Sequence, residues 1–317
     1  MRATRWRWVL RWALLACLAC PFSPALAYLV NVVGSDNGTA FQQASDSLVQ
    51  ELVRNGLARK DIGLLGVAEH QEMAPAVAEA RLTISLGTEA FRQVCARNAK
   101  AAVLAALIPR VSFERVLQEA NKKSGTTISA LYLDQPFGRQ LDLLRLALPG
   151  ARRIGVLWGP ESISQQGLLG AALQARGMEA SEGVYAEGQP LIGALRGALQ
   201  DADALLAIAD NTVYNSSTVA NILLTSYRAK TPVLAFSPAY VKAGAMLSVH
   251  STAMQAGIQV AAMAGHYLQT GNLPANQYPT DFTITTNEYV ARSLGLSLDA
   301  RALSERLRKL DRTEKKP

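Results

Sequence analysis

The fold is predicted by the stretch LTISLGTEAFRQVCARNAKAAVLAAL, residues 82–107, which contains one full repeat of a pattern that runs along the chain. Residues 82–87 are a short apolar run that ends at a glycine, and residues 101–107 are a second such run. The residues between them, 88–97, favour a helix. Short, nearly continuous apolar strands that alternate with helices are typical of a parallel sheet covered on both faces.

The same alternation extends in both directions, from Tyr28 to about Phe236. It predicts an α/β protein whose further strands lie at residues 29–34, 62–66, 128–133, 154–158, 204–209 and 233–236. The helices expected between the strands include 73–80 and 213–229, and a long amphipathic helix is expected at 251–271. These strands are too many for one open sheet of usual width, so we expect two lobes that meet near residues 133–138.

The composition is that of an ordered globular protein: the chain has 317 residues, of which 49% are hydrophobic and 18% charged. The formal net charge of +7 is concentrated at the two ends. Residues 1–27 and residues 301–317 each carry a net charge of +4, which leaves the body, residues 28–300, at −1. A nearly neutral body gives no indication of a nucleic-acid partner.

The first 27 residues have the features of a cleaved secretory signal. Basic residues precede an apolar stretch at 12–19, and Ala25-Leu26-Ala27 forms an A-x-A cleavage site before Tyr28. The apolar stretch is too short to span a membrane. A lipoprotein cleavage site at Cys17 is the less favoured alternative, because it falls too early in the apolar run. Only Cys95 remains after cleavage, so the exported chain has no internal disulfide.

Three stretches carry a resemblance to a known family: LDQPFGRQLDLLRLALPGARRIGVLWGP (133–160), ADNTVYNSSTVANILLTSYRAKTPVLAFSPAYVKAGAMLSV (209–249) and FTITTNEYVARSLGLSL (282–298). They resemble the periplasmic substrate-binding proteins of ABC transporters, and in particular the members that bind aromatic amino acids or related small molecules. The resemblance implies a type I periplasmic binding fold. In that fold two Rossmann-like lobes with parallel sheets are joined by three hinge crossings.

The resemblance also implies how the chain is divided. The crossings are expected near residues 131–135, 246–250 and 279–282. Residues 28–131 with 250–279 would form the N-terminal lobe, and 132–249 with 280–298 the C-terminal lobe. A C-terminal helix and a basic tail would follow at 299–317. The sequence departs from the family at Leu107-Ile108-Pro109, where members usually show Thr-Asp-Pro. This change removes polar groups from the rim of the first lobe and favours a more apolar ligand than an amino acid.

Polar candidates for the site follow the ends of predicted strands, where ligands bind in open α/β sheets. Asp210 could pair with a ligand ammonium, and Asn211 offers both a donor and an acceptor. In the first lobe, Gly87 and Thr88 suit a carboxylate. The alternative for Thr88, Asn211 and Thr212 is that each merely caps the next helix. Three further candidates follow the first predicted strand: Ser35, Asp36 and Thr39.

Aromatic candidates stand at similar positions. Trp158 ends the strand predicted at 154–158 and either lines the cleft or packs in the core. Three other aromatic residues, Phe137, Tyr214 and Phe236, could stack on a flat ligand. Gln135, in the first expected crossing, and Ser237, which follows Phe236, complete the candidate set.

Several other chemistries lack their motifs. His70, His250 and His266 are scattered, and Cys95 stands alone, so we expect no metal site and no cofactor. No nucleotide-binding glycine motif is present, and no G-x-S-x-G nucleophile elbow. Asp210 and His250 could pair as orienter and base, but a nucleophile is missing, so we do not expect an enzyme.

These observations favour an exported, periplasmic and monomeric solute-binding protein that captures a small molecule between two lobes. The ligand would be an amino acid or an aromatic or apolar compound, and the resemblance implies delivery to an ABC permease. Two alternatives stay open: a ligand-sensing or accessory subunit that acts with another receptor, and an exported α/β enzyme. A sugar-responsive repressor shares the lobes, but the signal and the missing helix-turn-helix exclude it.

Overall fold

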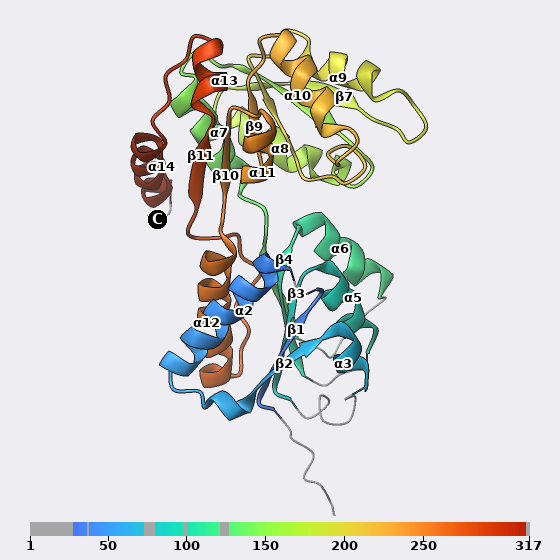
Figure 1. Ribbon diagram of the computed structural model, residues 1–317, viewed down its shortest axis with the longest axis vertical. Coiled ribbons are helices and arrows are strands. Elements are labelled where there is room, and N and C mark those ends of the chain that lie inside the picture. The colour runs from blue at the N-terminus through green and yellow to red at the C-terminus, as the bar shows by residue number, and fades with distance from the viewer. Residues whose placement is uncertain (1–27, 37, 73–79, 98–100, 121–126, 315–317) are drawn as a thin grey trace, which may run out of the picture.

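The computed structural model describes residues 28–36, 38–72, 80–97, 101–120 and 127–314, which form two α/β lobes (Figure 1). The predicted signal at 1–27 and most of the helix predicted at 73–80 lie outside the described residues. Among the described residues, no helix combines the length and the hydrophobicity that crossing a membrane requires.

The first lobe is built on a parallel five-stranded sheet with the order β2-β1-β3-β4-β5. Its strands are almost wholly buried because helices cover both faces, as Figure 1 shows. The strands are β1 (Val30–Gly34), β2 (Ile62–Gly66), β3 (Leu82–Leu86), β4 (Ala102–Ile108) and β5 (Ile128–Tyr132). The helices are α2 (Thr39–Arg54), α3 (Val67–Glu72), α5 (Thr88–Ala96), α6 (Arg110–Glu119) and α12 (Ala253–Thr270).

Helix α12 belongs to this lobe although it comes from the second half of the chain. It begins with a capping box, in which Thr252 and Gln255 satisfy each other's backbone N–H groups. It packs against α2 at a very close approach, because a Cβ added to Gly257 would lie 2.1 Å from Ser47 Oγ and 2.4 Å from the Ala44 carbonyl oxygen. The pair covers one face of the sheet, and α5 and α6 cover the other.

The second lobe contains a six-stranded sheet with the order β11-β10-β9-β8-β6-β7, in which only the β10–β11 pair is antiparallel. The strands are β6 (Arg153–Trp158), β7 (Glu179–Val184), β8 (Ala204–Leu206), β9 (Val233–Ala235), β10 (Leu247–His250) and β11 (Thr283–Thr286). The helices are α7 (Phe137–Ala147), α8 (Gln166–Gln174), α9 (Leu191–Leu199), α10 (Val219–Arg228), α11 (Pro238–Ala243), α13 (Glu288–Ser293) and α14 (Ala300–Glu314).

Three segments connect the lobes: residues 133–136 after β5, residues 251–252 between β10 and α12, and residues 278–282 before β11. A chain of hydrogen bonds ties these segments together. Arg139 Nη1 donates to Gln135 Oε1 (2.6 Å) and to the Pro279 carbonyl oxygen (2.8 Å). Gln135 Nε2 donates to Ser251 Oγ, whose hydroxyl donates to the Asp281 carbonyl oxygen. The crossings therefore lie side by side as one bonded unit.

The structure differs from the expectation for 213–229, because the helix there begins only at Val219. Residues 211–218 instead form turns, in which polar side chains bind the backbone and compete with helix formation. The Asn215 carboxamide donates to the Asn211 carbonyl oxygen and accepts from the Ser217 N–H. The Thr218 hydroxyl donates to the Val213 carbonyl oxygen.

Candidate ligand-binding site

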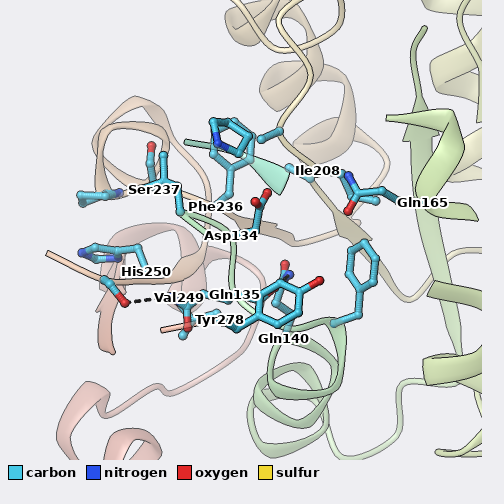
Figure 2. A pocket seen from close by; sticks show the side chains of 17 residues that line it. Asp134, Gln135, Gln140, Gln165, Ile208, Phe236, Ser237, Val249, His250 and Tyr278 are labelled. Carbon is cyan, nitrogen blue, oxygen red and sulfur yellow. Dashed lines mark hydrogen bonds between the residues drawn. The ribbon is translucent and has the colours of Figure 1, made fainter. Parts of the chain in front are cut away.

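A cavity of about 210 Å³ lies where the crossing segments meet the strand ends of the second lobe (Figure 2). Residues of both lobes and of all three crossings line it. It is smaller than the pockets of about 300–1,000 Å³ that hold drug-sized ligands, which indicates a small ligand. The lining residues are Pro109, Leu133, Asp134, Gln135, Phe137, Gln140, Gln165, Ala207, Ile208, Ala209, Phe236, Ser237, Pro238, Val249, His250, Ser251 and Tyr278.

Aromatic and aliphatic side chains form most of the pocket wall. Phe137 comes from the start of α7, Phe236 from the end of β9, and Tyr278 from the third crossing. The ring of Phe236 packs against Tyr214 and Tyr240, which do not line the pocket; their ring centroids lie 5.9 Å and 4.7 Å from its own. Aromatic pairs at such distances hold one another in place. The wall is therefore preformed and suits a flat apolar group.

Three titratable side chains line the pocket: Asp134, His250 and Tyr278. Asp134 Oδ2 accepts the backbone N–H of Arg110 (2.6 Å), which opens α6. Burial raises the pKa of the Asp134 carboxyl, although this hydrogen bond and the Arg110 guanidinium act in the opposite direction. Burial lowers the pKa of His250, so its imidazole is neutral at pH 7. The pocket therefore holds one carboxyl group and no charged base among its lining residues.

Four of the residues predicted from the sequence line this pocket: Gln135, Phe137, Phe236 and Ser237. Gln135 also holds the crossings together, because its side chain binds Arg139 and Ser251 and its carbonyl oxygen accepts from Gln140 Nε2. The sequence reasoning missed Asp134, Gln165 and His250. Asp134 lies in the first expected crossing, residues 131–135, directly before the candidate Gln135, and that position was the available signal.

The structure places the predicted first-lobe residues outside this pocket. Ser35 Oγ accepts the Ala90 N–H (2.9 Å) and so caps α5 from a neighbouring loop. Gly87 adopts φ 94°, and a Cβ there would lie 2.5 Å from Ser35 Oγ, so its role is a close approach of backbone segments. Asp36 accepts the Gly38 N–H and lines a separate hollow, while Thr39 and Thr88 open α2 and α5.

Of the two placements left open for Trp158, the structure shows the core and not the cleft wall, so Trp158 is not a ligand contact in this pocket. Its side chain is 0% exposed, and its indole N–H donates to Glu182 Oε1 (2.8 Å). The reason is topological: β6 lies between β8 and β7, and Trp158 packs with the residues under α7 and α8.

Asp210 organises a loop instead of lining the pocket. The residue is 3% exposed, and its Oδ2 accepts the Glu161 N–H (3.1 Å), the Ser162 N–H (2.8 Å) and the Ser162 hydroxyl (2.8 Å). Its Oδ1 accepts the N–H and the hydroxyl of Thr212. Both oxygens are thus occupied by the chain itself rather than left for a ligand ammonium.

The two neighbours of Asp210 in the candidate set also have structural partners. The Asn211 N–H donates to Glu161 Oε2 (3.0 Å), and its carbonyl oxygen accepts from Asn215. Tyr214 is buried behind Phe236, and that burial raises the pKa of its hydroxyl. Tyr214 therefore supports the pocket wall without contacting the cavity.

An ion pair joins the lobes away from the crossings. Arg115 Nη1, on α6, lies 2.8 Å from Glu161 Oε1, in the loop after β6. Because Glu161 also binds the Asn211 N–H, this pair connects the first lobe to the loop that Asp210 organises. Among the described residues, no group of three or more His, Cys, Asp or Glu side chains could hold a metal ion.

Two α/β lobes, three crossings and a pocket beside them define a protein of the type I periplasmic binding class. A family model for ABC transporter substrate-binding proteins matches residues 76–306, and the chain belongs to this family. The family is one of binding proteins rather than enzymes. A comparison with curated proteins found no match.

Solved structures show the same fold at low sequence identity. The ligand-free, open structure of CD0873, a substrate-binding protein with adhesive properties from Clostridium difficile, has a TM-score of 0.66 at 18% identity and covers 86% of this chain and 96% of that one. An ABC domain from Streptococcus pneumoniae in complex with L-Trp has a TM-score of 0.60 at 18% identity, with 87% and 97% covered. A conserved domain protein from Vibrio cholerae gives the same four values. These likenesses confirm the predicted fold.

Proposed function

We propose that this chain is an exported, monomeric solute-binding protein that captures a small aromatic or apolar molecule in the pocket beside the crossings and delivers it to an ABC permease. The single observation that carries the proposal is the make-up of the cavity. Both lobes and all three crossings contribute to its lining, so a ligand there touches every part that a hinge motion would move. The L-Trp complex of the Streptococcus pneumoniae relative supports an aromatic ligand.

The physical basis of capture is differential contact. A ligand against Phe236 gains further contacts when the first lobe approaches, so binding favours the closed arrangement. The Arg115–Glu161 pair, which joins the lobes in this structure, adds to the contacts that hold them together. The closed arrangement would be the form that a permease receives. The predicted signal at 1–27 supports export to the periplasm.

The proposal predicts that a matching ligand stabilises the protein. At 100 times its dissociation constant, a ligand adds about 2.7 kcal/mol to the free energy of unfolding. Melting temperatures should be measured against aromatic amino acids, their amides, branched amino acids and purines. Phe236→Ala should weaken the best ligand by about tenfold or more, because the aromatic wall is lost.

Tyr289→Ala is the matched control, since Tyr289 is 81% exposed on α13, away from the pocket. It should leave the ligand-induced shift unchanged. The proposal fails if no compound in the panel raises the melting temperature, or if Tyr289→Ala and Phe236→Ala weaken binding equally. Delivery is tested by uptake of the labelled ligand into cells that carry a candidate ABC permease, measured with and without this protein; equal uptake in the two would contradict delivery.

A further inference from the structure

The most informative polar group in the pocket is the carboxamide of Gln165. The residue is 4% exposed, and in the described part of the chain its Nε2 has no hydrogen-bond partner. Figure 2 shows the carboxamide at the edge of the pocket, on the side opposite Ser237 and His250. Burying an amide donor without an acceptor is unfavourable, so this group is best explained by an acceptor that arrives with the ligand.

The position of Gln165 is fixed by the loop that Asp210 organises. The Gln165 N–H donates to the Ser162 carbonyl oxygen (2.9 Å), and Ser162 is itself held by Asp210 through its N–H and its hydroxyl. The carboxamide therefore stands on a rigid support. A donor that is preorganised in this way can discriminate between ligands, because a compound without an acceptor leaves it unpaired.

The charged groups around the pocket indicate which charge the ligand carries. No Lys or Arg is present among the described lining residues, and burial keeps His250 neutral. The nearby Arg110 guanidinium is engaged by Glu114 (2.7 Å) and by the Tyr278 hydroxyl (3.0 Å). Asp134 remains the one carboxyl group among the lining residues. A ligand carboxylate would find no cation in this pocket and would face a carboxyl group, whereas an ammonium would find a partner.

We propose, on the basis of the function proposed above, that the ligand is an amine that carries an aromatic ring and a neutral acceptor group but no carboxylate. Its ammonium donates to Asp134, and its acceptor group accepts from Gln165 Nε2. Gln165 is then a specificity-determining residue of the site. This ligand class differs from the zwitterionic amino acid bound by the Streptococcus pneumoniae relative.

Three matched probes test the proposal by calorimetry: L-phenylalanine, L-phenylalaninamide and phenethylamine. The amide replaces the carboxylate by a neutral acceptor, and phenethylamine keeps the ammonium but has no acceptor. We expect the wild-type protein to bind the amide at least about tenfold more tightly than phenylalanine. Gln165→Leu should weaken the amide by about tenfold and leave phenethylamine nearly unchanged, since only the amide uses Nε2.

Gln165→Glu and Asp134→Asn complete the test. Glutamate at 165 should also weaken the amide, because it offers no donor, and Asp134→Asn should weaken both amines. A merely structural role for Gln165 would affect the amide and phenethylamine equally, and that result would overturn the assignment. Equal or tighter binding of phenylalanine would overturn the exclusion of carboxylates while leaving the proposed function intact. If no probe binds, but another compound of the wider panel does, the ligand class is wrong and the proposed function stands.

Discussion

Asp210→Ala is expected to lower the free energy of unfolding by about 3–5 kcal/mol, one of the two largest effects anticipated in this protein. The buried carboxylate accepts five hydrogen bonds, from Glu161, Ser162 and Thr212. Its removal leaves several buried donors without an acceptor, and each hydrogen bond to a charged group contributes about 1.5–3 kcal/mol. Urea unfolding followed by circular dichroism measures the change.

Asp36→Ala is the matched control for Asp210→Ala. Asp36 is also a carboxylate at the end of a strand, but it is exposed, and within the described residues it accepts a single hydrogen bond, from the Gly38 N–H. Its loss should cost about 1 kcal/mol or less. Similar losses in the two variants would contradict the account, because they would mean that the bonds around Asp210 do not support the loop.

Arg139→Leu is expected to cost about 3–5 kcal/mol, because it breaks the buried ion pair at the crossings. Arg139 is 3% exposed, its Nε donates to Asp311 Oδ2 (2.9 Å), and its guanidinium also lies against the ring of Phe282. The substitution leaves Asp311 on α14 without this partner and removes the bonds to Gln135 and Pro279. Chemical unfolding gives the size of the loss.

Two further variants distinguish the loss of the Arg139–Asp311 ion pair from other effects of the substitution on stability. Arg139→Leu combined with Asp311→Leu should recover part of the stability, since no unpaired carboxylate remains. Arg54→Ala removes an exposed pair, Arg54 with Glu51, and should change stability by no more than about 1 kcal/mol. If the double variant is as unstable as the sum of its single variants, the Arg139–Asp311 pair is not coupled as described.

Much of the fold could be predicted because its signals are local. Continuous apolar runs such as 82–87 form strands buried on both faces, and the residues between them form helices. The secondary structure was predicted less well in segments where polar side chains form hydrogen bonds with the backbone. Residues 213–218 were predicted as the start of a helix, but Asn215 and Thr218 hold them in turns. Strand β7 is hard to predict, because as an edge strand it is largely exposed and lacks an apolar run.

The site was harder to predict because only some of the side chains that follow the strand ends point into the cavity. Phe236 and Ser237 follow β9 and line the pocket, whereas Asp210, after the neighbouring β8, turns its carboxylate toward the Ser162 loop. A sequence shows that a strand ends at Trp158, but not that Glu182 on β7 will accept its N–H. Nothing in the sequence singled out Gln165. It is a candidate because its Nε2 is buried without an acceptor, and only the structure shows this.

The most direct test of the central claim is to fill the pocket and measure binding. Ala209→Trp places a large side chain in the cavity beside the crossings, and Ser45→Trp does the same in the separate hollow of the first lobe. Calorimetry with the tightest ligand of the panel should show binding abolished in Ala209→Trp and unchanged in Ser45→Trp, while both variants keep a cooperative unfolding transition. Binding that survives in Ala209→Trp, or that is lost in Ser45→Trp, would contradict the assignment of the ligand to this pocket.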